Sequence, residues 1–67
     1  MKNLNNHNHN YNLRAYTVFF RNIKNIREEN CFYAADAFEA RSLAMKFNEY
    51  INSHPNSIDL IRCEKAL

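Results

Sequence analysis

The side chains able to bind a metal or to carry out acid–base chemistry are few and widely separated along this sequence. His7 and His9 lie two positions apart in a stretch rich in Asn, with no Cys, Asp or Glu beside them to complete a coordination shell. His54 precedes Pro55 and has no partner nearby. We therefore expect neither a metal site nor a cofactor.

The carboxylates and thiols do not form a catalytic pattern. Asp36 and Glu39 have the spacing of a helix capping box, which commits both side chains to the start of a helix. Glu28 and Glu29 fall in a predicted loop, and no general base accompanies either cysteine. The chain has no glycine from which a phosphate-binding loop or an oxyanion turn would be built. The sequence thus favours a protein that is not an enzyme.

The capping box marks a change of hydrophobic period, from that of a strand to that of a helix. Residues 31–35 alternate in the manner of a strand, and the helix that starts at Asp36 should continue as one element to Ser53. The residue before a proline avoids helical geometry, so Pro55 places the end of the helix near His54.

Helical spacing gathers small and apolar residues into one stripe, wide enough to cover a sheet. Its members are Ala37, Ala40, Leu43, Ala44, Phe47, Tyr50 and Ile51. Phe47 lies in the middle of this stripe, and we expect its ring to form the centre of the core.

A strand and a hairpin loop are predicted before residue 31. Residues 13–22 are dense in β-branched and aromatic side chains, with Tyr16, Val18 and Phe20 on one face. Residues 23–30 carry charged side chains between Asn residues, which tolerate turn geometry, and predict the hairpin loop. The two strands of this hairpin should pair antiparallel.

The last strand is predicted over residues 58–64. Its alternation allows either face to point toward the helix, and we place Ile61 and Cys63 there because this keeps Arg62 out of the core. Cys31 then lies on the opposite face of the sheet from Cys63. This arrangement excludes a disulfide, so both cysteines are expected to be free thiols.

These elements define an α+β fold, a two-layer ββαβ unit with a three-stranded sheet and one helix on one face. The Asn- and His-rich residues 1–12 cannot bury enough apolar surface to offset the entropy of ordering them, and they are expected to form a disordered tail. Residues 13–67 form the single domain. The order of the strands does not follow from the sequence.

Composition restricts the class of partner. The 67 residues carry a net charge of +2, with 46% hydrophobic and 24% charged residues, which is too weakly basic to indicate nucleic acid. No apolar run approaches the roughly 18 residues of a membrane span, so we expect a cytoplasmic protein without membrane contact. A domain this small gains stability from association, and a second copy or another protein is the expected partner.

The fold leaves two surfaces for that partner. The first lies on the outer side of the helix and comprises Phe38, Arg41, Met45 and Lys46. The second is the sheet face without a helix, with Phe19, Arg21, Tyr33, Leu60 and Arg62. The tail, a second copy or a binding partner would cover this sheet face.

A family resemblance is carried by residues 31–44 (CFYAADAFEARSLA), 15–18 (AYTV) and 60–64 (LIRCE). Their strand, cap, alanine-rich helix and closing strand resemble a type I-F anti-CRISPR family, within the wider class of small phage and mobile-element proteins. The resemblance implies an inhibitor that occupies the nucleic-acid path of a CRISPR effector through protein contacts. It also implies that Arg41 and Lys46, which match basic helix positions of that family, make those contacts.

Two functions remain open at this point. Phe19 and Tyr33, flanked by Arg21 and Arg62, are typical of a platform on which single-stranded nucleic acid stacks. The glycine-aromatic motif of ribonucleoprotein domains is absent, however, and the charge excess is small. We therefore expect a non-catalytic protein-binding module, with a single-stranded nucleic-acid-binding module as the alternative.

Overall fold

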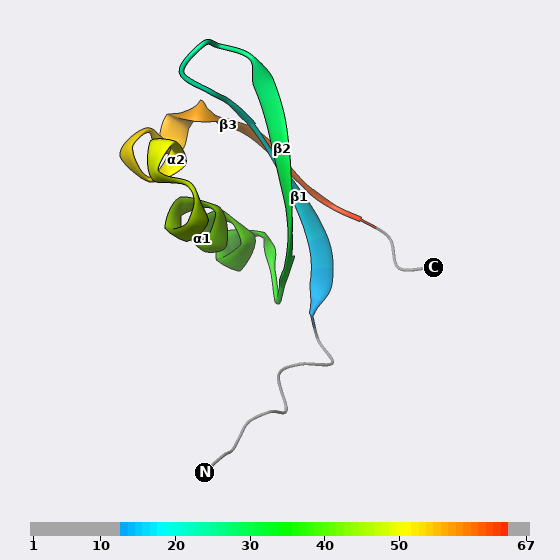
Figure 1. The fold of residues 1–67 in the computed structure, drawn as a ribbon. Coiled ribbons are helices and arrows are strands. Elements are labelled where there is room, and N and C mark those ends of the chain that lie inside the picture. Colours follow the sequence, from blue (N-terminus) through cyan, green and yellow to red (C-terminus); the bar gives the residue numbers. More distant parts are fainter. Residues whose placement is uncertain (1–12, 65–67) are drawn as a thin grey trace.

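Three strands and two consecutive helices make up residues 13–64, the part of the chain that this computed structural model describes. The elements are β1 (Arg14–Arg21), β2 (Arg27–Ala34), α1 (Ala37–Phe47), α2 (Glu49–Ser53), the 3-10 turn η2 (Pro55–Ser57) and β3 (Ile58–Cys63). Both helices lie on one side of the sheet (Figure 1). The predicted α+β fold is confirmed, whereas the predicted tail, with His7 and His9, lies outside the described residues.

The sheet has the order β2-β1-β3, so the first strand of the chain is the central one. β1 runs antiparallel to both of its neighbours, which makes β2 and β3 parallel to each other. The helical connection therefore carries the chain from one edge of the sheet, across β1, to the other edge. The backbone N–H of Glu64 donates to the carbonyl of Ala15 at 2.8 Å, so the end of the last strand lies beside the start of the first.

The side-chain alternation along β1 sets both faces of the sheet. Tyr16, Val18 and Phe20 are buried toward the helices, as predicted. On β3, Ile61 lies opposite Val18 and packs against the core, and Cys63 lies opposite Tyr16. The predicted orientation of the third strand is therefore confirmed.

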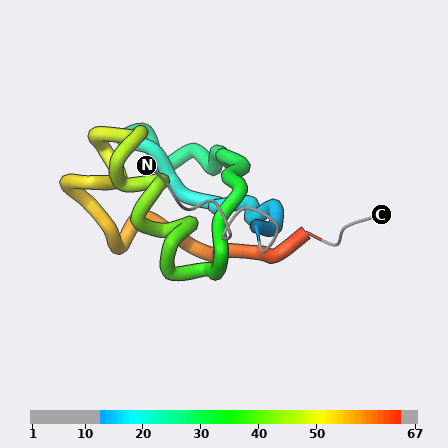
Figure 2. Tube along the Cα trace, turned by 90° about the horizontal axis from the view of Figure 1, so that it is seen from below, coloured from blue at the N-terminus to red at the C-terminus, as the bar shows by residue number. Residues whose placement is uncertain are grey.

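The two cysteines lie on opposite faces of the sheet, and both are free thiols. Cys31 lies opposite Thr17 and Cys63 opposite Tyr16, and neighbouring residues of a strand point to opposite faces. β3 extends past the end of the helical layer (Figure 2). For this reason Cys63 is exposed although it lies on the helix side.

The hairpin turn is tighter than predicted, and β2 begins at Arg27 rather than at residue 31. Asn22 organises the turn, since its side-chain oxygen accepts hydrogen bonds from the backbone N–H groups of Lys24 and Ile26. Asn25 adopts a left-handed conformation with φ of 63°, which Asn tolerates in place of glycine. Because the turn closes so early, the following charged residues belong to the strand and not to a loop.

The helix start at Asp36 is confirmed. The Asp36 carboxylate accepts a hydrogen bond from the backbone N–H of Glu39 at 2.8 Å. The Glu39 carboxylate reaches back to the N–H of Ala35 at 2.6 Å, one residue before the N–H that a capping box predicts. Two backbone donors at the strand-to-helix junction are thereby satisfied.

The prediction of one continuous helix is wrong, because the helix breaks at Asn48. This residue has an extended backbone (φ −129°, ψ 109°), and its side-chain oxygen accepts from the N–H of Ile51 at 3.1 Å. Asn is unfavourable inside a helix but favourable as an N-cap, and Asn48 therefore ends α1 and starts α2. The helix ends at Ser53, before Pro55, as predicted.

The prediction that Phe47 is the centre of the core is also wrong, because its side chain is 75% exposed. Ala40 and Ala44 are fully buried on the helix side of the core, and the large rings of the core come from the sheet. Ala37, at the start of the predicted stripe, is exposed. The largest fully buried side chain is Phe20. The core cluster comprises Tyr16, Val18, Phe20, Ala34, Ala40, Ala44 and Ile51.

Candidate functional site

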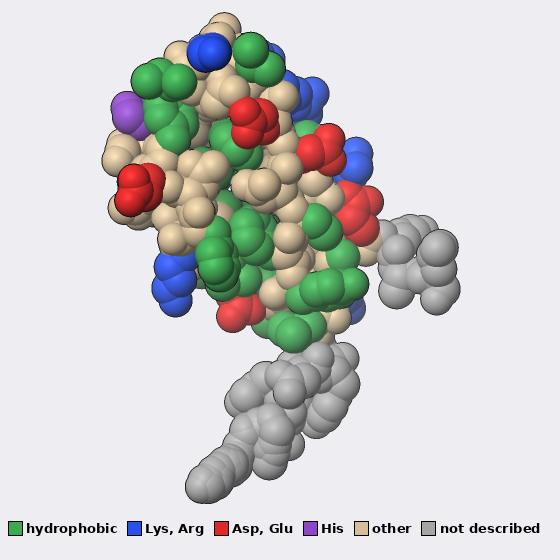
Figure 3. All heavy atoms as spheres, viewed as in Figure 1, with side chains coloured by type: hydrophobic (Ala, Val, Ile, Leu, Met, Phe, Trp, Pro, Cys, Tyr) green, Lys and Arg blue, Asp and Glu red, His purple; other side chains and the backbone are tan. Residues whose placement is uncertain are grey.

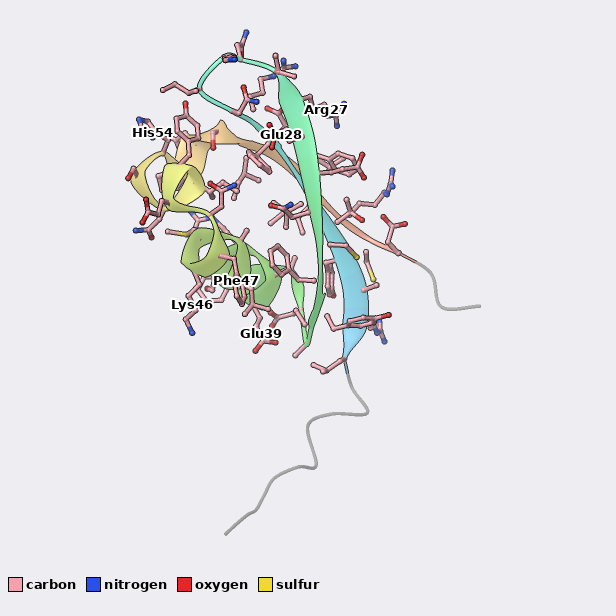
Figure 4. The ribbon with its side chains drawn as sticks, in the orientation of Figure 1. Arg27, Glu28, Glu39, Lys46, Phe47 and His54 are labelled. Atoms are coloured by element: carbon pink, nitrogen blue, oxygen red, sulfur yellow. The ribbon has the colours of Figure 1, made fainter. Side chains whose placement is uncertain are left out.

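The predicted residues on α1 do not form one uniform patch. Phe38 is 74% exposed, and Arg41, one turn further along α1, is half-buried. Lys46 is exposed and extends away from the sheet (Figure 4). Met45 was placed on the outer side, but it is partly buried and packs against the core cluster. The part of the predicted site that solvent reaches, here called the helix surface, is therefore Phe38, the half-buried Arg41 and Lys46.

Phe19 lies at the centre of the sheet face without a helix, here called the open face. Its ring is only 8% exposed, because two guanidinium groups lie over it. The Cζ atom of Arg27 on β2 is 4.6 Å from the ring centroid, and that of Arg62 on β3 is 5.0 Å from it. These cation–π contacts close the ring off from an incoming base.

The other predicted residues of the open face are accessible, and two of its cations are paired. Tyr33 is 71% and Leu60 46% exposed. Arg21 forms an ion pair with Asp59 at 3.2 Å, and Arg62 forms one with Glu64 at 2.9 Å. Ion pairing at these two arginines reduces the positive charge that this face offers to a phosphate.

Arg27 is the residue of the open face that the sequence prediction missed. It forms no ion pair within residues 13–64 and holds its guanidinium over Phe19. The prediction placed Arg27 in the hairpin loop, so its side-chain direction was not considered. The closely spaced Asn22 and Asn25 are the sequence signal of a short turn, and they would have led to a prediction with Arg27 in the strand.

A hydrogen-bonded carboxylate joins β1 to the end of β3. The hydroxyl of Thr17, a buried side chain, donates to Glu64 at 2.6 Å, and Nε of Arg62 donates to the same oxygen at 3.0 Å. The hydrogen bond from Thr17, and after it the one from Arg62, lowers the pKa of Glu64 below its ordinary 4.5. The Glu64 side chain thus links the end of β3 to β1.

The buried phenol of Tyr16 is the second group with a shifted pKa. Removal from water raises the pKa of Tyr16 above its ordinary 10.0, and the neighbouring thiol of Cys63 raises it further. Both effects favour the protonated phenol.

A third exposed apolar area, absent from the sequence predictions, lies where α1 meets β2. The rings of Phe32 and Phe47 stack there with centroids 5.9 Å apart and planes inclined by 20°. Figure 3 shows hydrophobic side chains gathered between the helical layer and β2. β2 is an edge strand, and no strand within residues 13–64 pairs with its outer side. We call this area the β2 edge, defined by Phe32, Phe47 and the outer backbone of β2.

Within residues 13–64, no group of three or more His, Cys, Asp or Glu side chains is placed to hold a metal ion. None of the helices in this part of the chain is both long enough and apolar enough to cross a membrane.

The fold and its surfaces define a small two-layer α+β domain with three exposed areas, one on the helix, one on the sheet face and one on a sheet edge. The chain belongs to the family described as Domain of unknown function (DUF8647), whose model matches residues 15–64. Comparisons with curated proteins and with solved structures find no match.

Proposed function

We propose that this domain is a non-catalytic protein-binding module that contacts its partner through the helix surface. The observation that carries the proposal is the 74% exposure of Phe38 on a capped helix, beside the basic Arg41. Exposed aromatic residues and arginines are enriched at protein interfaces and supply most of their binding energy. A helix presents them with little loss of entropy on binding.

The covered ring of Phe19 supports protein binding over nucleic-acid binding. A single-strand platform needs an exposed aromatic face for each stacked base. Arg27 and Arg62 occupy that position over Phe19, and Arg62 is also held by Glu64. Stacking on Phe19 would first require both cation–π contacts to be broken.

A capture experiment with two helix variants tests the proposal. Phe38→Ala should weaken capture of the partner about tenfold or more, as truncation of an interface anchor does. The double variant Arg41→Glu with Lys46→Glu should weaken capture with little change in the melting temperature, because Lys46 is exposed and the half-buried Arg41 forms no ion pair within residues 13–64. The double variant Arg14→Glu with Lys24→Glu is the matched control, since it makes the same change of charge at exposed sites away from α1. Unchanged capture by both helix variants would contradict the proposal.

The resemblance to a type I-F anti-CRISPR family supplies the first partner to assay, and with it a role in the cytoplasm of the host cell. We propose that the partner is a CRISPR effector complex whose nucleic-acid path the domain blocks. The domain should then bind the purified type I-F effector complex and prevent it from binding target DNA. The Arg41→Glu and Lys46→Glu variant should lose this inhibition.

The exposed Tyr33 and the guanidinium of Arg27, which forms no ion pair within residues 13–64, lie on the same face of β2 and favour nucleic-acid binding as the second candidate function. This rival predicts micromolar binding of single-stranded RNA or DNA, with an affinity that falls steeply as salt is raised. Tyr33→Ala should then abolish binding, and the helix variants should retain it. Such a pair of results would replace the protein-binding proposal.

A further inference from the structure

The backbone of β2 offers a regular set of hydrogen-bonding groups along its outer side. In an antiparallel ladder, residues alternate between those that bond to the partner strand and those that point away from it. The N–H of Asn22 donates to the carbonyl of Ile26 at 2.9 Å, which places the even-numbered residues of β2 toward β1. The odd-numbered residues therefore direct their N–H and C=O groups outward. They are Arg27, Glu29, Cys31 and Tyr33.

We propose that a second copy of this chain occupies the β2 edge. The two β2 strands pair antiparallel about a two-fold axis at Cys31, so that two three-stranded sheets form one continuous sheet. All four helices of the dimer then lie on the same side of this sheet. The inference goes beyond the proposed function and uses a surface separate from the helix surface.

The distribution of charge along β2 is compatible with this register. Charged residues occupy the first half of the strand and uncharged residues the second. With Cys31 on the axis, Glu29 lies opposite Tyr33 of the second copy and Glu28 lies opposite Ala34. Each charged side chain thus meets an uncharged one, and no like charges are opposed.

The neighbouring registers are less favourable. Pairing must match outward groups with outward groups, so the register changes in steps of two residues. A step in one direction also opposes no like charges, but it places the Glu28 carboxylate opposite Phe32, in the apolar part of the proposed interface. A step in the other direction places Glu28 opposite Asp36, which would bring two negative charges together.

The exposed aromatic pair supplies the apolar part of the interface. With Cys31 on the axis, the two Phe32 rings lie on a diagonal across the junction, which is within reach of aromatic side chains. Phe47 is stacked on Phe32 and 75% exposed, and the second copy's Phe32 and Phe47 would cover it. Pairing therefore removes apolar surface from water as well as satisfying the backbone.

The other edge of the sheet is less suited to pairing. β3 has six residues against eight in β2, and its pairing with β1 is irregular between Phe19 and Phe20. Short strands and bulges are the devices that protect an edge from strand addition. The preference for β2 follows from this difference between the edges.

Sedimentation equilibrium of single variants tests the proposal. Tyr33→Pro removes an outward N–H but no hydrogen bond to β1, so the variant should remain folded and become monomeric. Cys63→Pro is the matched control at the outer side of β3 and should remain a dimer. Should Tyr33→Pro fail to fold, Phe47→Glu places a charge at an exposed position of the same edge and should also give a monomer.

Thiol cross-linking tests the register. Residues that face each other in a hydrogen-bonded antiparallel pair have Cα atoms about 5.5 Å apart, so a short bis-maleimide should join Cys31 to the second copy's Cys31. Cys63→Ser should retain the cross-linked dimer and Cys31→Ser should lose it. A monomeric wild type at the highest soluble concentration, a dimer indifferent to Tyr33→Pro and Phe47→Glu, or cross-linking through Cys63 would each overturn the proposal. Partner capture through the helix surface is measured in a separate experiment. A monomeric protein would therefore contradict the dimer proposal without contradicting the proposed function.

Discussion

Phe20 and Phe47 both lie on the apolar side of their element in the sequence pattern, but only Phe20 is buried. Phe20 lies on the central strand and is 1% exposed, whereas Phe47 lies at the end of α1 and is 75% exposed. The alternation along β1 was sufficient to predict the first. The helical stripe failed for the second, because spacing alone does not show that α1 ends at Phe47 and that this ring stacks on Phe32.

Truncating these two rings should have unequal effects on stability. Phe20→Ala should cost about 3–5 kcal/mol of unfolding free energy, which is enough to unfold a domain this small. Phe47→Ala should cost about 1 kcal/mol or less, since only its stacking on Phe32 is lost. Urea unfolding at a concentration where the chain is monomeric measures both, and a larger loss for Phe47→Ala would show that the core is placed wrongly.

The hydrogen-bonded Glu64 should make stability depend on pH. Its pKa is lowered in the folded state, chiefly by the Thr17 hydroxyl and then by Arg62, so its stabilising effect is present above 4.5 and is lost as the pH falls through the folded pKa. The urea concentration at the midpoint of unfolding should therefore decrease for the wild type as the pH is lowered below 4.5. Glu64→Gln and Thr17→Val should each show a shallower decline, whereas Glu29→Gln, a control for loss of one exposed charge, should follow the wild type.

At the scale of the elements, side-chain caps decide where the helices begin and end. Asp36 caps α1 as the sequence predicted, because a capping box is a local signal. The break at Asn48 was missed, since the same Asn is tolerated within a helix when no tertiary contact favours a bend. The early start of β2 was missed for a related reason, because the side chain of Asn22 closes the turn through hydrogen bonds that composition does not reveal.

Loss of the first cap should destabilise the domain measurably. Asp36→Ala should cost about 0.5–2 kcal/mol, because the N–H of Glu39 loses its acceptor. Asp36→Asn retains an accepting oxygen and should cost less. Equal stability of Asp36→Ala and the wild type in urea unfolding would mean that the cap contributes nothing to the junction.

Loss of the second cap tests whether the bend at Asn48 is required. Asn48→Ala raises helix propensity, but it removes the acceptor for the N–H of Ile51, a fully buried residue. We expect a net cost of about 0.5–2 kcal/mol, because α2 must keep its direction for Ile51 to stay in the core. A more stable variant with helical chemical shifts through residue 48 would show that a straight helix fits the sheet equally well.

At the scale of the whole molecule, the layers and the faces could be predicted, but the strand order and the exposed β2 edge could not. Alternation in β1 and β3 was enough to place Val18 and Ile61 on the same face. Strand order depends on the path of the helical connection, which no local pattern encodes. The closed ring of Phe19 likewise depends on Arg27 and Arg62, which come from strands far apart in the sequence.

Association through the β2 edge should couple stability to concentration. The folded dimer gains from mass action whereas the unfolded chains do not, so the melting temperature should rise with protein concentration. A tenfold increase contributes about 1.4 kcal/mol per dimer, or about 3–6 °C for a domain of this size. Phe47→Glu should melt at a temperature independent of concentration, and equal slopes for the two proteins would rule out coupling at this edge.

The hydrogen bond from Glu64 to Ala15 has a consequence for the connectivity of the chain. Since the start of β1 and the end of β3 lie side by side, a short linker can join them, and the turn at Asn25 provides an exposed place for new termini. In such a circular permutant, β3 and β1 become a hairpin. The pairing that spans the longest separation in the natural chain would then be one of the most local. The pairing of β1 with β2 becomes the long-range one in its place, so the permutant should reach the same fold with the order of strand pairing exchanged.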